Sequence, residues 1–277
     1  MSANQLFTWT SLSRTDVGRR RKVNEDACID RGDIGLWVVA DGMGGHSAGD
    51  VASGMIVETM AEVGALSSLK ELVDESESRL LAVNTRLREI AMTHKSGTVG
   101  STVAVLMIHG THCVCMWAGD SRIYRFRDGA LEKIMQDHTH VEELVARGVL
   151  TAEQAAVHPD ANLITRAVGA QDELFLDLEI DTLQDGDLFV VCSDGLDKEV
   201  TEDEIAQAAA NGNDENLAST LVELALKAGA RDNVTVITVT VEAQGSDDDI
   251  TVPPSGRRGL DGEHTVPRND GGNTNAQ

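Results

Sequence analysis

The sequence predicts an α+β fold in which helices pack outside antiparallel sheets. Short apolar runs of strand-like length recur along the chain, and two long segments carry the 3.6-residue periodicity of amphipathic helices. The expected strands are mostly consecutive and the long helices are adjacent. Strict alternation of strands and helices along the chain would predict a parallel sheet. The observed grouping of strands with strands and helices with helices predicts separate layers of each.

The expected strands are apolar runs at residues 36–40, 103–108, 113–118, 188–192 and 234–241. The run at 234–241 has apolar residues or Thr on both faces, which is typical of a strand that is covered on both sides. A hairpin is expected at Asp128-Gly129, because this dipeptide lies between the apolar runs 123–126 and 131–134.

The two long helices are predicted from apolar residues that return to one face every three or four positions. The two faces consist of Ala52, Met55, Ile56, Thr59, Met60 and Val63, and of Leu69, Leu72, Val73, Leu80, Val83, Leu87 and Ile90. Further helices are expected at 201–210 and 214–228.

The composition changes near residue 244. Residues 245–277 hold three of the four prolines and no aromatic residue. Such a stretch cannot bury enough apolar surface to offset the entropy lost on ordering. We therefore expect one folded domain over 1–244 and a disordered tail over 245–277.

The charge and the cysteine content exclude several classes of protein. A formal net charge of −23 disfavours binding to nucleic acid or to an anionic membrane surface. The apolar runs are too short to cross a bilayer, and the first residues do not resemble a secretory signal. Four cysteines do not suggest a disulfide scaffold, and Cys113 and Cys115 would share one strand face without a second pair to complete a zinc site. We expect a cytoplasmic protein.

Acidic residues fall at the ends of several expected strands. They are Asp41 before Gly42, Asp120, Asp194 before Gly195, and Asp232, with Glu25 and Asp26 before a further short strand. A single Asp-Gly is usually a turn, but several such ends can meet at one rim of a sheet. Carboxylates held close together repel one another unless a cation compensates them, and all-oxygen ligation favours Mg²⁺ or Mn²⁺ over zinc or copper.

A basic cluster lies beside these acids. It consists of Arg14, Arg19, Arg20, Arg21 and Lys22. The planar fork of an arginine can bind a phosphate through two parallel hydrogen bonds. We assign this role to Arg21 and expect Arg19, Arg20 and Lys22 to be solvated. Metal ions next to an arginine suggest the hydrolysis of a phosphoryl group.

Seven short motifs occur in a fixed order. They are R-x-x-N-E-D at 21–26, V-x-D-G-M-G-G-H at 39–46, G-S-T-V at 100–103, A-G-D-S-R at 118–122, I-T-R-A-V-G at 164–169, S-D-G-L at 193–196 and R-D-N-V-T at 231–235. Together they resemble the bacterial branch of the PP2C, or PPM, metal-dependent Ser/Thr protein phosphatases, over roughly residues 10–241. The sequence is also similar to PP2C phosphatases of type VI secretion clusters.

The resemblance implies a central antiparallel β-sandwich flanked by helices on both sides, in four layers, with two Mn²⁺ or Mg²⁺ ions at one end. By this resemblance, Asp41 bridges both ions and the Gly42 carbonyl binds one of them. Asp194 and Asp232 would hold the other ion. Glu25 and Asp26 would act largely through coordinated water. Asp120, together with Asp194, would bind a weaker third ion.

The resemblance also implies how the substrate is bound and cleaved. Arg21 would bind the substrate phosphate, and Asn233 would hydrogen-bond near the phosphate or its water. Two metal ions about 4 Å apart lower the pKa of a shared water toward 7, from about 15.7 in bulk water. The resulting hydroxide attacks phosphorus in line, so no Cys or Ser nucleophile is required.

Two features of the sequence bear on the family pattern. Met43 stands where many eukaryotic relatives have a His that is thought to protonate the leaving group, and Met cannot donate a proton. The general acid is therefore left open between His46, a metal-bound water and bulk solvent. Residues 139–165 fall where bacterial members carry a flap near the site, and such segments tend to set substrate choice.

Two alternatives were weighed against the phosphatase. Residues 45–49 fit the G-x-S-x-G elbow of a serine hydrolase, but residues 41–44 separate them from the preceding strand, and Ser47 also suits a helix cap. A metal-binding scaffold without activity should have lost a ligand, whereas Asp41, Asp194 and Asp232 are all present. We expect a cytosolic phosphatase that acts on a phosphoprotein and reverses a bacterial Ser/Thr kinase, with the kinase or its target as partner.

The expected tail carries a separate hypothesis. Thr251 and Thr265 each follow an acidic residue closely and precede Val-Pro. Phosphorylation of these threonines would let a phosphothreonine-binding module recognise the tail. Chance similarity of two short pieces is the equally open alternative.

Overall fold

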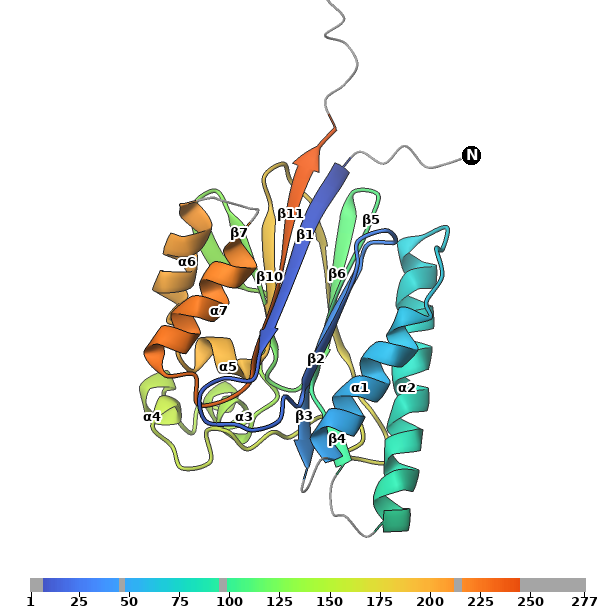
Figure 1. Cartoon of the computed structure of the whole chain (residues 1–277), viewed down its shortest axis with the longest axis vertical. Coiled ribbons are helices and arrows are strands. Elements are labelled where there is room, and N and C mark those ends of the chain that lie inside the picture. Colours follow the sequence, from blue (N-terminus) through green and yellow to red (C-terminus); the bar gives the residue numbers. More distant parts are fainter. Residues whose placement is uncertain (1–6, 45–47, 95–98, 212–215, 245–277) are drawn as a thin grey trace, which may run out of the picture. The chain divides into compact units, whose positions relative to one another are not determined.

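The architecture was analysed in a computed structural model, which describes residues 7–44, 48–94, 99–211 and 216–244. Over these ranges it contains eleven strands and seven helices. Two antiparallel sheets lie face to face, and helices cover the outer face of each sheet (Figure 1). The predicted α+β class and its four layers are confirmed.

The first sheet has five antiparallel strands in the order β1, β11, β10, β7, β8. Their bounds are β1 (Phe7–Asp16), β11 (Val234–Ala243), β10 (Leu188–Cys192), β7 (Arg122–Arg127) and β8 (Ala130–Lys133). The predicted hairpin joins β7 to β8. Asp128 and Gly129 adopt φ values of 52° and 80°, the left-handed conformation that a tight hairpin turn requires.

The second sheet has six strands, five of them in the order β2, β3, β5, β6, β9. Their bounds are β2 (Asp26–Arg31), β3 (Leu36–Gly44), β5 (Val103–His109), β6 (His112–Ala118) and β9 (Asp177–Thr182), and β4 (Val99–Ser101) pairs with β3. β3 is longer than the predicted run at 36–40, because its far end pairs with β4 from Gly42 to Gly44. Asp41 therefore lies inside a strand rather than in a turn.

The contact between the two sheets is apolar and closed to solvent. Trp37 and Val39 of β3 and Leu106 of β5 pack against Phe189 and Val191 of β10, and all five side chains are fully buried. Helices cover the other face of these strands, so side chains on both faces are buried. This explains why these segments are continuous apolar runs in the sequence. This double burial fixes the strand ends on which the acidic residues lie.

The helices form the two outer layers (Figure 1). α1 (Ala48–Ala61) and α2 (Leu69–His94) cover the second sheet, and α6 (Glu202–Ala210) and α7 (Leu217–Ala228) cover the first, with the single-turn α5 (Asp194–Asp197) between β10 and α6. Apart from α5, which was not predicted, these helices match the predicted segments to within a few residues. Thr201 caps α6 through a reciprocal pair of hydrogen bonds with Glu204, which explains where that helix begins.

The expected flap at 139–165 contains two short helices that the sequence patterns did not reveal. They are α3 (His140–Ala146) and α4 (Ala152–Ala156), each begun by a threonine that caps the first turn. A β-bridge between Thr139 and Ile164 closes the base of the segment. The flap is thus a segment between β8 and β9 whose two ends pair with each other.

Other sequence expectations can be compared with the structure only in part. Cys113 and Cys115 are buried in one apolar cluster, and all four cysteines are unpaired. In the portion of the chain that the structure describes, there is no helix both long and apolar enough to cross a membrane. The expected tail at 245–277, with Thr251 and Thr265, and the residues His46 and Ser47 lie outside the described residues.

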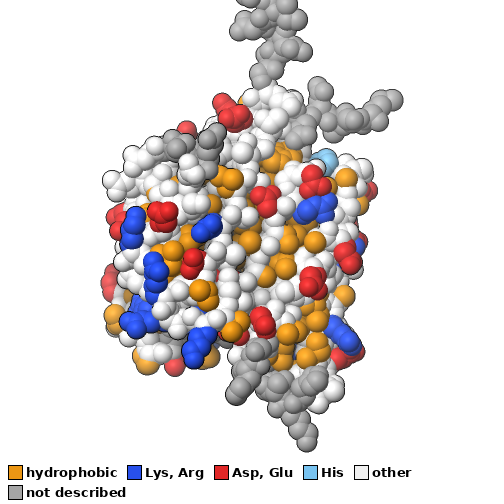
Figure 2. All heavy atoms as spheres, in the orientation of Figure 1, with side chains coloured by type: hydrophobic (Ala, Val, Ile, Leu, Met, Phe, Trp, Pro, Cys, Tyr) orange, Lys and Arg blue, Asp and Glu red, His pale blue; other side chains and the backbone are white. Residues whose placement is uncertain are grey.

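Charged side chains of both signs are interspersed with apolar ones over the face drawn in Figure 2. Arg19, Arg20 and Lys22 are exposed, as expected for solvated members of the basic cluster.

Replacing Phe189 by Ala tests the inter-sheet core. Phe189 is fully buried between the sheets, so the substitution should lower the free energy of unfolding by about 3–5 kcal/mol. Phe175 is 60% exposed, and Phe175→Ala, the matched control, should change it by no more than about 0.5 kcal/mol. Urea denaturation followed by circular dichroism measures both values, and equal losses would contradict the packing described here.

Candidate active site

The predicted site residues meet at one end of the sandwich, around a cavity of about 220 Å³. Seven of them line it: Arg21, Glu25, Asp41, Gly42, Asp194, Asp232 and Asn233. Asp26 is buried and accepts a hydrogen bond from Ser193, the residue before Asp194. Asp120 lines a neighbouring cavity of about 250 Å³ that Asp194 also lines. Residues separated by two hundred positions in the sequence are thus brought into one cluster.

The backbone of Asp41 is held by hydroxyl side chains from the next strands. The Asp41 N–H donates to Oγ1 of Thr102 at 3.1 Å, and the Thr102 N–H donates to the Asp41 carbonyl at 2.9 Å. The Thr102 and Ser121 hydroxyls are 2.6 Å apart, and both residues are buried. These two residues belong to the G-S-T-V and A-G-D-S-R motifs, which explains why those motifs accompany the acidic ones.

Gly42 stands where three backbone segments meet. A Cβ atom on Gly42 would lie 2.1 Å from the carbonyl oxygen of Gly49 and 2.6 Å from that of Glu25. The Gly42 N–H donates to the Glu25 carbonyl at 3.0 Å, and the Ser53 hydroxyl of α1 donates to the same carbonyl at 2.6 Å. Any larger residue at position 42 would push the acidic segments apart.

A second glycine brings Asp194 to Asp232. A Cβ atom on Gly195 would lie only 1.8 Å from the Asn233 carbonyl oxygen, so the start of α5 crosses the start of β11 at contact distance. The Ser193 N–H donates to the Thr235 carbonyl at 3.0 Å and fixes this crossing. The pairs Asp41-Gly42 and Asp194-Gly195 are therefore close backbone crossings rather than surface turns.

Asp26 is buried, and only one of its two carboxylate oxygens has hydrogen-bond partners. Its Oδ2 accepts hydrogen bonds from the Ser193 and Thr235 hydroxyls, both at 2.7 Å, whereas its Oδ1 is buried without a partner. Burial raises the pKa of Asp26 to about 7, against the effect of these two hydrogen bonds. The nearby charges of Asp194 and Asp232 raise it further.

The same physical causes act on the other acids of the cluster. Burial raises the pKa of Asp41 well above its ordinary value, and the charges of Asp26, Asp194, Asp120 and Asp232 add to the effect. Burial, followed by the charge of Asp194, raises the pKa of Asp120 to about 7. The protein alone thus disfavours the ionised form of several of these carboxylates at neutral pH.

Two protein cations reach the cluster. Nη2 of Arg21 lies 2.9 Å from Oδ2 of Asp232, and the Lys198 ammonium forms an ion pair with Oδ2 of Asp194. Among the described residues, no three Asp, Glu, His or Cys side chains are already gathered as one metal site. Each ion pair directs a carboxylate oxygen toward a protein cation.

The donor atoms nevertheless suit hard divalent cations. Oδ1 of Asp26, Asp120 and Asp194 are all buried without hydrogen-bond partners, and the remaining candidate ligands are also oxygen atoms. Such unpartnered anionic oxygens are costly unless a cation binds them. An oxygen-only set fits Mg²⁺ or Mn²⁺, as the sequence predicted.

The side chain of Asn233 is held within the protein. Its Nδ2 donates to the carbonyls of Val17 and Val23 at 2.9 and 3.0 Å, and its Oδ1 accepts the Glu25 N–H at 2.8 Å. Both of its donor hydrogens are therefore used within the protein, and they hold the Glu25 segment in place. The expected hydrogen bond of Asn233 near the phosphate or its water stays a prediction.

Other candidate groups are less suited to chemistry. Met43 lines the cavity, so the position contributes no proton donor. Burial raises the pKa of the Cys28 and Cys113 thiols to about 11, which disfavours thiolate chemistry. The segment that fits the serine-hydrolase elbow lies partly outside the described residues, and its Gly49 packs against Gly42.

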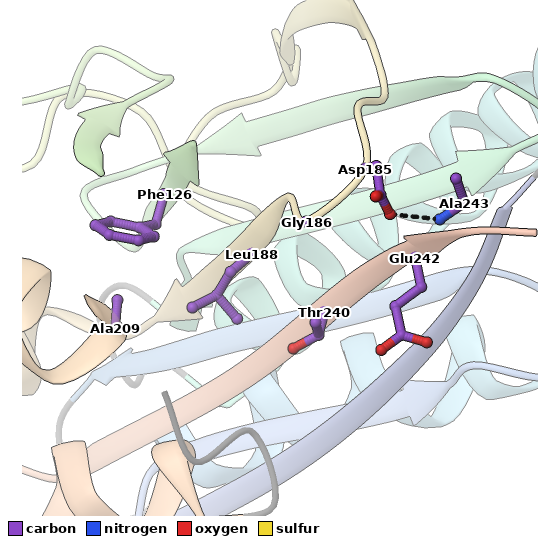
Figure 3. A pocket seen from close by; sticks show the side chains of 8 residues that line it. All are labelled: Phe126, Asp185, Gly186, Leu188, Ala209, Thr240, Glu242 and Ala243. Carbon is purple, nitrogen blue, oxygen red and sulfur yellow. Dashed lines mark hydrogen bonds between the residues drawn. The ribbon is translucent and has the colours of Figure 1, made fainter. Parts of the chain in front are cut away.

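A larger cavity, of about 490 Å³, lies at the opposite end of β11 (Figure 3). Phe126, Leu188 and Thr240 line it, and Oδ1 of Asp185 accepts the Ala243 N–H at 2.8 Å. None of the seven motifs contributes to its wall. Chemistry rather than size therefore identifies the smaller cavity as the candidate active site.

Comparisons with known sequences agree with this choice. The sequence model of a family described as Protein phosphatase 2C matches residues 17–226. The serine/threonine protein phosphatase PstP of Mycobacterium tuberculosis is 32% identical over 256 residues, which cover 87% of this chain and 49% of PstP. The chain thus spans about half the length of PstP. The protein phosphatase PhpP of Streptococcus pneumoniae is 32% identical over 242 residues, which cover 84% of this chain and 98% of PhpP.

Two solved structures are similar over the whole described domain. PppA, described as a key regulatory component of the type VI secretion system in Pseudomonas aeruginosa, is 41% identical with a TM-score of 0.79, covering 86% of this chain and 98% of its own. The catalytic domain of PstP, in complex with two manganese ions, is 32% identical with a TM-score of 0.76, covering 85% and 99%.

The raised carboxyl pKa values predict how pH affects the metal-free protein. Asp26 and Asp120 titrate near pH 7 when folded but near 3.8 when unfolded, so the folded state binds more protons between these values. Stability should therefore fall as the pH rises, and the melting temperature should drop by at least about 5 °C from pH 5 to pH 8. Thermal melts in EDTA measure this, and Asp120→Asn should reduce the drop. A melting temperature that rises with pH, or an unchanged drop in the variant, would contradict the assignment.

Proposed function

The chain belongs to the protein phosphatase 2C family, and we propose that it is a metal-dependent protein serine/threonine phosphatase that opposes a bacterial Ser/Thr kinase. The observation that carries the proposal is the cavity in which Asp41, Asp194 and Asp232 converge beside Arg21. Its cofactors are two Mn²⁺ or Mg²⁺ ions, in line with the manganese-bound structure of the PstP catalytic domain.

Each acidic residue has a proposed place in this site. Asp41, Gly42, Asp194 and Asp232 all line the cavity. Asp41 and the Gly42 carbonyl would hold one ion, and Asp41 together with Asp194 and Asp232 would hold the other. Glu25 and Asp26 act through coordinated water. Asp120 lies next to Asp194 in the neighbouring cavity and suits a weaker third ion.

When bound, the ions supply an activated water as nucleophile and stabilise negative charge in the transition state. The residues of the chain orient the reaction around them. The Asp41 N–H donates to the Thr102 hydroxyl and the Ser53 hydroxyl donates to the Glu25 carbonyl, so both segments are held at fixed positions. No covalent intermediate on the protein is needed. The high thiol pKa values agree with this, since they leave the cysteines as packing residues.

Arg21 is the proposed binding group for the substrate phosphate. Its side chain is 48% exposed at the rim of the cavity. Within the described residues, its guanidinium makes one hydrogen bond, to Asp232, so further donors are available for a phosphate. An arginine fork can bind two phosphate oxygens at once and orient the phosphorus for in-line attack.

The proposed substrate is a phosphoprotein, either the kinase or one of its targets. The flap borders the cavity that Asp120 lines, and its exposed Val149, Val157 and Leu163 offer apolar contacts to a protein substrate. PppA is described as a regulatory component of type VI secretion, and the 41% identity supports a similar signalling role here. Four unpaired cysteines suit the reducing cytoplasm. In the tail, Thr251 and Thr265 are the proposed sites for a phosphothreonine-binding partner.

A direct assay tests the activity. The purified full chain should hydrolyse p-nitrophenyl phosphate and a phosphothreonine peptide with Mn²⁺ and lose this activity in EDTA. Asp194→Ala should lower kcat/KM by at least about 10³-fold, because it removes a ligand oxygen at the reaction centre. Asp203→Ala, an exposed residue on α6, is the matched control and should retain full activity.

Two outcomes would contradict the proposal. Turnover that persists in EDTA, or cleavage of acyl esters instead of phosphate esters, would favour the serine-hydrolase interpretation. A folded protein without turnover under either metal would favour the scaffold interpretation.

A further inference from the structure

Lys198 places a positive charge inside the acidic cluster, and no motif of the sequence accounts for it. It follows the single turn of α5 and stands four residues after Asp194, a spacing that puts both side chains on one face of a helical turn. Its ammonium forms an ion pair with Oδ2 of Asp194 and lies 3.9 Å from Oδ2 of Asp232. These are the two carboxylates proposed to hold one metal ion.

The surroundings of Lys198 are more enclosed than those of a surface lysine. Its side chain is 30% exposed, and with Asp120 and Asp194 it lines the cavity beneath the flap. Oδ1 of both aspartates is buried without a partner, and the ammonium pairs with the other carboxylate oxygen of Asp194. The other cation of the cluster, Arg21, contacts only Asp232 among these acids and is more exposed.

We propose that Lys198 is a tethered counter-ion that competes with a divalent cation for Asp194 and Asp232. The inference rests on the proposed metal-dependent function and deepens it. In the metal-free protein, the ammonium stabilises the ionised carboxylates; on metal binding it must leave them. Lys198 thereby lowers the affinity of this site for metal and keeps the site folded without it.

The competition follows from charge and geometry. An ammonium that donates to Oδ2 of Asp194 uses an oxygen that a metal ion would need, and two cations at one carboxylate repel each other. The flexible four-carbon stem of lysine lets the ammonium withdraw without moving the backbone. The free energy lost when this ion pair opens is subtracted from the binding of the metal.

The proposal predicts opposite signs for two measurements. A lysine with a purely structural role would, when removed, lower both the stability of the metal-free protein and its affinity for metal. A competing counter-ion would, when removed, lower the stability of the metal-free protein but raise its affinity for metal. This difference in sign separates the two roles without reference to catalysis.

Titration calorimetry of EDTA-stripped full-length protein with MnCl₂ provides the test. Lys198→Gln should bind Mn²⁺ about tenfold more tightly than the unsubstituted protein, the factor that corresponds to the loss of one charge-assisted hydrogen bond. Its metal-free melting temperature should be lower by about 2–4 °C. Lys198→Arg keeps the charge and should retain the original affinity.

Lys227→Gln is the matched control, because Lys227 is also four residues after its acidic partner, Glu223, but lies on the exposed side of α7. It should leave both values unchanged. Equal or weaker Mn²⁺ binding by Lys198→Gln would overturn the counter-ion role and leave the phosphatase proposal intact. Absence of Mn²⁺ binding in the unsubstituted protein would overturn both.

Discussion

The repulsion among buried carboxylates at one end of the sandwich is the constraint on which the site depends. Burial and nearby negative charge penalise the ionisation of Asp26, Asp41 and Asp120. Asp26, Asp120 and Asp194 each keep a buried oxygen without any hydrogen-bond partner. Folding alone does not relieve this repulsion. A divalent cation does, so the feature that strains the metal-free protein is the one that creates its affinity for metal.

The rest of the fold serves to hold these charges together. Two apolar sheets with helices on both outer faces keep the strand ends in fixed positions, and Gly42 and Gly195 let the backbones of those ends approach to contact distance. Buried hydroxyls then fill the gaps between the acids: Thr102 supports Asp41, and Thr235 supports Asp26. The positive charges of Lys198 and Arg21 compensate part of the negative charge of these acids.

Much of this arrangement could be predicted from the sequence, and the exceptions have physical causes. Fully buried strands and long amphipathic helices were predictable because their apolar patterns are strong. The strands β1 and β9 were not, since they are edge strands with mixed burial, and Ile180 of β9 is 65% exposed. The acidic residues were predictable as a group because they lie at the ends of the expected strands. The backbone contacts of Asn233 and the ion pair of Lys198 were not, because both depend on which groups the fold brings next to these side chains.

Anomalous diffraction from crystals grown with MnCl₂ shows whether the acidic cluster is a site for two metal ions. We expect two manganese peaks in the cavity between Asp41 and Asp232, both within ligand distance of the Asp41 carboxylate. Peaks only on the outer surface, or a cavity without peaks while Asp194 and Asp232 stay paired to Lys198 and Arg21, would contradict it.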